Sequence, residues 1–162
     1  MVVSLPNRLV ANREWWKFDM KAVINEAQKS GQAPNVSDAH TINGNPGPTP
    51  NCVDNGGFKL PVDQGKTCML SIVNAALSEE LFFRIANHKF TVVDVDTVCV
   101  KPFTTDTILI APGQTTNALV SASQKAGKYL VAVSTFMDAP IALTISQPRC
   151  LFVILVFSLQ PP

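Results

Sequence analysis

Short runs of β-branched and aromatic residues recur between residues 58 and 134, and turn-forming residues separate each run from the next. Glycine, proline, asparagine and aspartate in the separating segments supply the backbone conformations that tight turns need. No helical pattern lies between successive runs, which argues against a doubly wound α/β fold. The pattern therefore predicts an antiparallel β-sandwich, with strands expected at 58–62, 67–74, 81–86, 90–95, 98–101, 107–111, 117–122 and 129–134.

One short helix is expected in front of these strands. Residues 20–30 carry apolar side chains at near-helical spacing, Asp19 stands before them and Gly31 follows them. An aspartate before such a segment and a glycine after it are the usual start and stop signals of a helix. Residues 33–57 are rich in proline, glycine and asparagine and are expected to form a loop, within which 40–43 is a candidate short strand.

The balance of charge and hydropathy excludes two classes of partner. The net charge is +1 and the lysines and arginines form no run, so we expect no nucleic-acid binding. The most apolar stretch, residues 150–159, has half of the roughly 20 residues that a membrane-spanning helix needs, so we expect no membrane span. Residues 1–12 lack the continuous apolar stretch of a signal peptide, and we expect no export signal in this sequence.

The cysteines do not have the spacing of a zinc or iron–sulfur site, which brings two thiolates to one metal through C-x-x-C pairs. Cys68 and Cys99 are expected to behave as small buried apolar residues. Asn35 begins an N-x-S tripeptide and is a glycosylation candidate if the protein is secreted. The four cysteines are Cys52, Cys68, Cys99 and Cys150.

The histidine count limits copper chemistry. A blue copper centre needs two imidazoles and a thiolate, and an oxygen-reducing cluster needs several histidine pairs. The chain has two histidines, His40 and His88, which excludes the full set of oxidase ligands. One alternative stays open, a single copper held by both histidines and a cysteine, with Met69 or Met137 as axial ligand. The competing interpretation places His88 in a turn between two strands and His40 after a loop.

Several long motifs follow one another in the order found in one protein family. Together they span residues 14–141 and closely resemble the second domain of plant laccases, which are multicopper oxidases. The motifs are EWW at 14–16, APNVSDA at 33–39, TING at 41–44, NAAL at 74–77, ELFF at 80–83, IANH at 85–88, TVVDVD at 91–96, VKPF at 100–103, ILIAPGQTTN at 108–117, QKAGKY at 124–129 and FMDAP at 136–140.

This resemblance implies an oxidase of three Greek-key cupredoxin (plastocyanin-like) domains that is secreted to the apoplast and cell wall, oxidises phenols such as lignin precursors, and reduces oxygen to water. In that family the first and last domains supply the histidine-rich copper motifs, and none of these motifs is present here. The chain is therefore interpreted as the middle domain, which binds no copper itself and is inactive alone. Its expected partners are the flanking cupredoxin domains and, in the parent oxidase, copper and a phenolic substrate.

The resemblance also divides the chain into three segments. Residues 1–13 are an unmatched N-terminal segment, 14–141 form the cupredoxin domain, and 142–162 are a divergent hydrophobic tail. We expect the tail to originate from a shifted reading frame, a retained intron or a mispredicted gene model. Residues 151–157 are nonetheless long and apolar enough to pair as a strand, which at a sheet edge would favour aggregation.

By resemblance, Ser78, Glu79 and Glu80 lie where the middle domain approaches the phenol pocket. A carboxylate there can accept the hydrogen bond or the proton of the substrate hydroxyl. Plant laccases often read Asn-Asp-Glu at this point, whereas this chain reads Ser-Glu-Glu. The alternative is that these are solvated surface groups. No other catalytic residue is expected, because nothing like a G-x-S-x-G nucleophile motif is present.

Three functions are compatible with the sequence. The first is an inactive fragment of a laccase-like oxidase. The second is a non-catalytic interaction module that associates with intact oxidase chains through an exposed interdomain face. The third, an independent electron carrier with one copper, is least favoured because of the histidine count.

Overall fold

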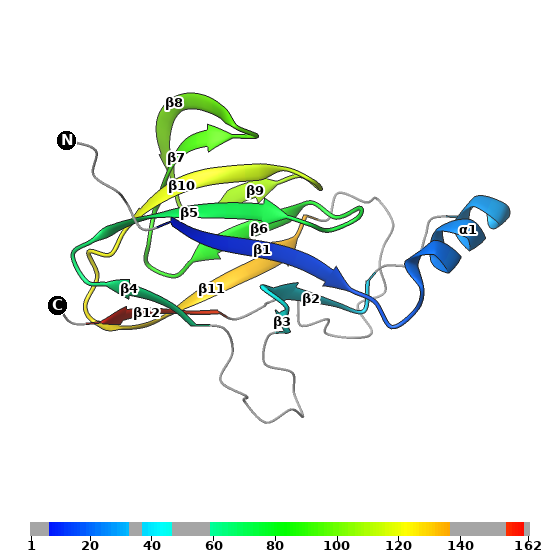
Figure 1. The fold of residues 1–162 in the computed structure, drawn as a ribbon, viewed down its shortest axis with the longest axis horizontal. Coiled ribbons are helices and arrows are strands. Elements are labelled where there is room, and N and C mark those ends of the chain that lie inside the picture. Colours follow the sequence, from blue (N-terminus) through cyan, green and yellow to red (C-terminus); the bar gives the residue numbers. More distant parts are fainter. Residues whose placement is uncertain (1–6, 33–36, 47–58, 137–154, 161–162) are drawn as a thin grey trace.

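A computed structural model describes residues 7–32, 37–46, 59–136 and 155–160 of the chain. These residues form two packed β-sheets with one helix beside them (Figure 1). The first sheet has the order β3-β2-β1-β5-β10-β7-β8 and the second has the order β4-β12-β11-β6-β9. The first sheet contains β1 (Asn7–Trp15), β2 (Ala39–Ile42), β3 (Asn45–Pro46), β5 (Thr67–Asn74), β7 (Phe90–Val95), β8 (Val98–Thr105) and β10 (Thr115–Ser121). The second contains β4 (Lys59–Asp63), β6 (Leu81–Ile85), β9 (Ile108–Ile110), β11 (Gly127–Thr135) and β12 (Leu155–Gln160).

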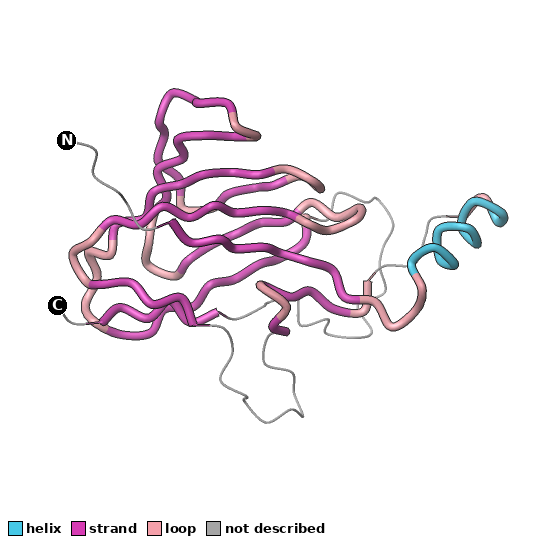
Figure 2. The backbone as a smooth tube through the Cα atoms, viewed as in Figure 1, coloured by secondary structure: helices cyan, strands magenta, loops and turns pink. Residues whose placement is uncertain are grey.

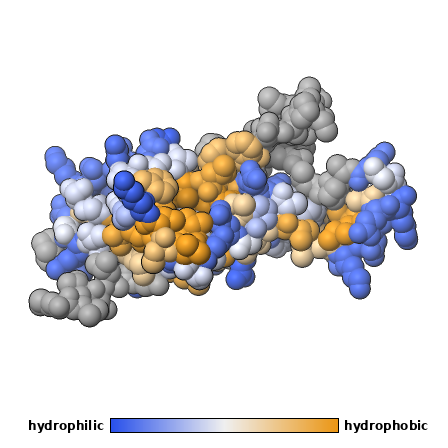
Figure 3. All heavy atoms as spheres, turned by 90° about the horizontal axis from the view of Figure 1, so that it is seen from above, coloured by the Kyte–Doolittle hydropathy of each residue, from blue (hydrophilic) through white to orange (hydrophobic). Residues whose placement is uncertain are grey.

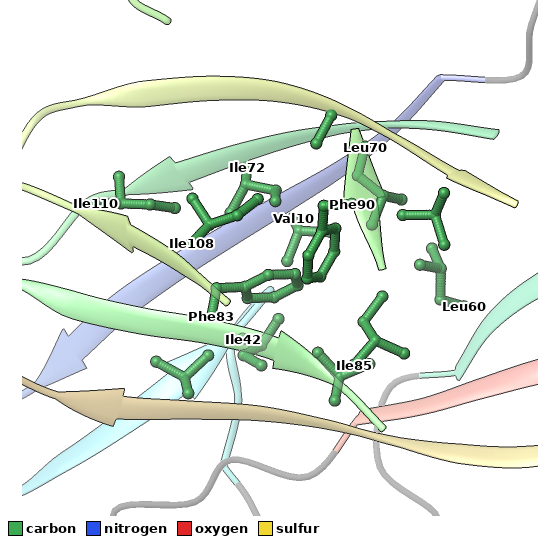
Figure 4. Packing of buried hydrophobic residues seen from close by; sticks show 14 of the residues in the cluster. Val10, Ile42, Leu60, Leu70, Ile72, Phe83, Ile85, Phe90, Ile108 and Ile110 are labelled. Atoms are coloured by element: carbon green, nitrogen blue, oxygen red, sulfur yellow. The ribbon is translucent and has the colours of Figure 1, made fainter. Parts of the chain in front are cut away.

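The core lies between the two sheets because the strands alternate between buried and accessible positions. In β5 every second residue, from Cys68 to Asn74, is buried. Leu81, Phe83 and Ile85 of β6 face them from the other sheet. The rings of Phe83 and Phe90 meet at the centre, with their centroids 5.6 Å apart (Figure 4). Burial of these side chains is the main source of stability in a sandwich of this kind.

The expected strands are largely confirmed. β5 and β7 have the predicted bounds, and β4, β6, β9, β10 and β11 differ from their predictions by one or two residues at an end. β8 continues to Thr105, four residues further than predicted. Pro102 is tolerated inside it because β8 is the edge strand of its sheet and its pairing with β7 is irregular at that point.

Both ends of the described chain contribute strands that the sequence analysis left outside the sandwich. β1 lies between β2 and β5 and pairs with β5 in parallel. Val10, Ala11 and Asn12 are buried in succession, so the two-residue alternation that reveals a strand is absent from this segment. β12 pairs with β11 and, in parallel, with β4, so the tail strand lies inside its sheet and not at an edge.

The predicted helix is confirmed. α1 (Met20–Ser30) begins where the Asp19 side chain accepts a hydrogen bond from the Lys21 N–H at 3.0 Å. It ends at Gly31, whose φ of 68° is in the left-handed region that glycine adopts without strain. No residue of α1 is buried. The helix therefore projects away from the sandwich (Figure 2).

Candidate functional site

Ser78, Glu79 and Glu80 lie together on the loop between β5 and β6, residues 75–80, which we call the rim loop. Ser78 and Glu80 are exposed, whereas the Glu79 side chain is 19% exposed. Leu77 beside them is half exposed at 50%. The two adjacent carboxylates are therefore in different environments: one faces solvent and the other turns toward the protein.

A buried asparagine fixes the backbone of the rim loop. Asn74, the last residue of β5, has no exposed surface. Its side-chain amide donates to the Glu79 carbonyl at 2.8 Å and to the Ile110 carbonyl at 2.9 Å. Its side-chain oxygen accepts from the Ala76 N–H at 2.9 Å. One buried amide thus connects the loop with β5 and β9, and because this amide has no exposed surface, leaving its bonds unmade would be costly.

The other end of the rim loop is attached to the end of β11. The Phe136 N–H donates to the Glu80 carbonyl at 2.8 Å. The rings of Phe82 and Phe136 meet edge to face with centroids 5.5 Å apart. The backbone of Glu80 is therefore fixed while its side chain stays in solvent.

Two further side chains from the first sheet reach the rim loop, Glu14 of β1 and His40 of β2. They are directly opposite each other in the antiparallel β1–β2 pair. One carboxylate oxygen of Glu14, Oε2, accepts from the Leu77 N–H and from the Trp16 indole N–H, both at 3.1 Å. His40 Nε2 lies 2.9 Å from Glu79 Oε2, close enough for an ion pair when the imidazole is protonated, although the two groups are not aligned as a hydrogen bond.

Sequence reasoning assigned neither Glu14 nor His40 to this loop. Glu14 is 63 residues from Leu77 along the chain, and no local motif connects the two. The alternation of β1 is also hidden by its consecutive buried residues, so its register with β2 could not be read from the sequence. The contacts follow only from the strand pairing.

The proposed copper donors have other roles in the structure. His88 lies in the turn between β6 and β7, as expected, and its Nδ1–H donates to the Ala86 carbonyl at 2.8 Å. Its ring packs edge to face on Tyr129. Within the described ranges no three His, Cys, Asp or Glu side chains gather where they could hold a metal ion. These residues therefore do not fit a copper centre, and that the whole chain binds no copper stays a prediction.

The two described cysteines differ. Cys68 is buried in the core, and its burial raises the pKa of the thiol. Cys99 is exposed, so the expectation that it is buried is wrong. The reason is that most of β8, at the sheet edge, lies in solvent. Met69 is half-buried on β5. The other residues singled out from the sequence, Asn35, Cys52, Met137 and Cys150, lie outside the described residues.

Among the helices of the described residues, none is long and apolar enough to cross a membrane.

Solved structures of copper oxidases share this two-sheet architecture. A mutant of the laccase from B. aclada has a TM-score of 0.76, with 22% identity, over 97% of this chain and 30% of its own. Fet3p, a multicopper oxidase that functions in iron import, has a TM-score of 0.74, with 17% identity, over 94% of this chain and 27% of its own. At such identities the likeness concerns the fold, which is a sandwich of the cupredoxin type, as the sequence predicted.

Sequence relatives then define the family. The multicopper oxidase family model matches residues 7–148, a range that begins at the first residue of β1. The chain belongs to the multicopper oxidase family. It is 64% identical over 136 residues to Laccase-4 of Arabidopsis thaliana and 60% identical over 129 residues to Laccase-22 of Oryza sativa subsp. japonica. These matches cover 84% and 79% of this chain but 24% and 23% of the relatives, so the chain spans about a quarter of their length.

Proposed function

We propose that this chain is the middle domain of a laccase-type oxidase and that its rim loop forms one side of the phenol pocket. The observation that carries the proposal is the rim loop itself, in which a fixed backbone leaves both Ser78 and Glu80 exposed. The identity to plant laccases supports the substrate class, and the quarter-length match supports a division of labour among domains. Cell-wall and apoplastic secretion is part of the same proposal.

The chemistry assigned to the rim is acceptance of a hydrogen bond and a proton. A phenol that loses an electron becomes a stronger acid, so a carboxylate beside its hydroxyl assists the step by taking the proton. Copper ions held by other domains of the oxidase would accept the electron. Glu80 suits the proton-accepting role better than Glu79, because the Oε2 atom of Glu79 already faces His40 at 2.9 Å. The hydroxyl of Ser78, which is also exposed, can donate or accept a hydrogen bond.

The proposal is tested in an intact oxidase. Residues 7–136 would replace the matching segment of Laccase-4 of Arabidopsis thaliana, to which the chain is 64% identical. Glu80→Gln keeps the size of the side chain but removes its basicity, so we expect kcat/KM for a phenol to fall by roughly tenfold, within the usual range for the loss of a general base. Oxidation of a substrate without a dissociable proton, such as ferrocyanide, should be unchanged. Glu26→Gln, an equally exposed substitution on α1, is the control.

Equal activity of Glu80→Gln and the chimera toward the phenol would contradict the assignment.

A second function, association with intact oxidase chains, is favoured by a specific surface. Val98 and Phe103 of β8 are 65% and 53% exposed, and Leu109 of β9 is 45% exposed. Phe103 and Leu109 border a hollow of about 150 Å³ that is also lined by residues of β7 and β10. Figure 3, which views the molecule from the side of β8, shows an apolar area on this face. Such a surface suits burial against another apolar domain surface.

Phe103→Ser should abolish co-elution of this chain with an intact laccase in size-exclusion chromatography.

A further inference from the structure

Glu14 and His40 bind the rim loop from a different sheet than the one the loop leads into. β1 and β2 belong to the first sheet, whereas β6, which follows the loop, belongs to the second. Glu14 accepts the Leu77 N–H at 3.1 Å, and His40 contacts the carboxylate of Glu79 at 2.9 Å. The contacted residues, Leu77 and Glu79, are the two sequence neighbours of Ser78. The loop is thus attached to the first sheet by these side chains and not only through the backbone of β5.

The burial of the pair makes the His40 contact important for the orientation of Glu79. The His40 side chain is 9% exposed and that of Glu79 is 19% exposed. A carboxylate so far removed from water is stable only beside a basic or hydrogen-bonding partner. His40 is the basic side chain that the described residues bring into ion-pair distance of Glu79. Without His40, the Glu79 side chain would have a lower free energy when turned outward to solvent.

Glu14 is the second acidic group at this point; both of its hydrogen bonds go to Oε2, while its Oε1 atom is buried without a hydrogen-bond partner among the described residues. Its Oε2 atom receives both the Leu77 and Trp16 N–H groups. Hydrogen bonds to a carboxylate are charge-assisted and stronger than those between neutral groups. The remaining charged neighbours are engaged elsewhere or point away: Lys17 pairs with Asp38 at 3.8 Å, and Arg13 is exposed.

We infer that Glu14 and His40 are positioning residues that determine which carboxylate of the rim loop faces the ligand. His40 holds Glu79 inward and Glu14 fixes the backbone at Leu77, so that Glu80 alone projects into the pocket. This inference rests on the proposed function for its ligand, but the clasp formed by Glu14, His40, Leu77 and Glu79 is a property of the chain itself. If Glu14 and His40 served only the folding of the strands, their substitution would affect the whole sandwich and not the rim loop alone.

The first experiment measures the clasp in the isolated chain by nuclear magnetic resonance. Glu14→Gln and His40→Ala should accelerate hydrogen exchange of the Leu77 amide by about tenfold, which corresponds to about 1.4 kcal/mol. The Gly65 amide, which bonds the Ala122 carbonyl in a distant turn, is the internal control and should exchange at an unchanged rate. Glu79→Gln should shift the ring nitrogen resonances of His40 and leave those of His88, the other histidine, in place.

Unchanged Leu77 exchange in both variants, or equal acceleration at Leu77 and Gly65, would overturn the inference. His40→Gln serves as the conservative variant, because its amide can still contact Glu79, and it should restore slow exchange if His40→Ala is too unstable to interpret.

The second experiment separates the clasp from the proposed function by using the same laccase chimera. His40→Ala should raise KM for a phenol severalfold with little change in kcat, because the loop is displaced while the electron acceptor is untouched. Faster Leu77 exchange together with an unchanged kcat/KM for the phenol in both His40→Ala and Glu80→Gln would uphold the clasp and overturn the phenol pocket. A lowered kcat/KM in Glu80→Gln alone, with unchanged Leu77 exchange in His40→Ala, would overturn the clasp and uphold the pocket.

Discussion

At the scale of single residues, the candidate site depends on a buried polar side chain, that of Asn74, whose amide nitrogen and oxygen are both hydrogen-bonded. Asn74 combines three hydrogen bonds to the loop and to β9 in one amide with no exposed surface. Such a group stabilises a structure only while all its partners are present, because each partner left unpaired away from water costs about 1–3 kcal/mol. Asn74 therefore fixes more of the backbone of the rim loop than Ser78, Glu79 and Glu80, the three residues that the sequence singles out.

Asn74→Ala should lower the free energy of unfolding by about 2–4 kcal/mol, since it leaves the Ala76 N–H and two carbonyls without their partner. Urea denaturation of the isolated chain measures the difference. Asn117→Ala is the matched control, because Asn117 is half-buried and bonds to the side chains of Ser71 and Asp94, where water can take its place. A larger loss for Asn117→Ala than for Asn74→Ala would contradict this account.

The two described cysteines should differ in reactivity. Burial raises the pKa of the Cys68 thiol, so less thiolate is present at any given pH, whereas Cys99 is exposed. Iodoacetamide followed by peptide mass spectrometry should modify Cys99 first at neutral pH. Because the folded pKa of Cys68 is raised, its contribution to stability is present at neutral pH and is lost as pH rises through the alkaline range. Preferential labelling of Cys68 in the native chain would be inconsistent with its placement in the core.

At the scale of elements, the sequence predicts most accurately the bounds of strands whose burial alternates, whereas β8, whose burial does not alternate, is four residues longer than predicted. β5 and β7 have their predicted bounds because their side chains alternate between core and surface. α1 was predictable from its two caps. β1 was missed because Val10, Ala11 and Asn12 are all buried. The positions of Glu14 and His40 at the rim loop were missed with it, because they follow from the pairing of β1 with β2. Chain connectivity cannot be read from periodicity when the pairing is parallel and the partners are far apart, as for β1 with β5.

β12 should be required for a stable second sheet. It pairs with β11 on one side and with β4 on the other, so its removal leaves both strands with unpaired backbone groups. A chain ending at residue 154 should therefore unfold at a lower urea concentration than the full chain. Removal of residues 161–162 alone is the control and should have little effect, since neither residue is part of the strand. Equal stability of both truncated chains would show that β12 is dispensable.

At the scale of the whole molecule, the chain is a cupredoxin-type sandwich of the multicopper oxidase family, and we propose that it contributes a pocket wall and depends on other domains for its metal. The family and fold follow from sequence and structure comparison. The division of labour is the proposed part, and it follows from chemistry visible in the sequence: two histidines cannot provide the ligands of an oxygen-reducing copper cluster. The exposed apolar residues of β8 and β9 are consistent with a surface that a neighbouring domain covers.

The most direct test of this claim is the copper content of the purified chain after incubation with Cu(II) and Cu(I) and removal of unbound metal. We expect far less than one copper per chain, no intense blue absorption and no phenol oxidation, and the same result for His40→Ala. One tightly bound copper per chain, lost in His40→Ala or His88→Ala, would contradict the account and establish an independent copper protein.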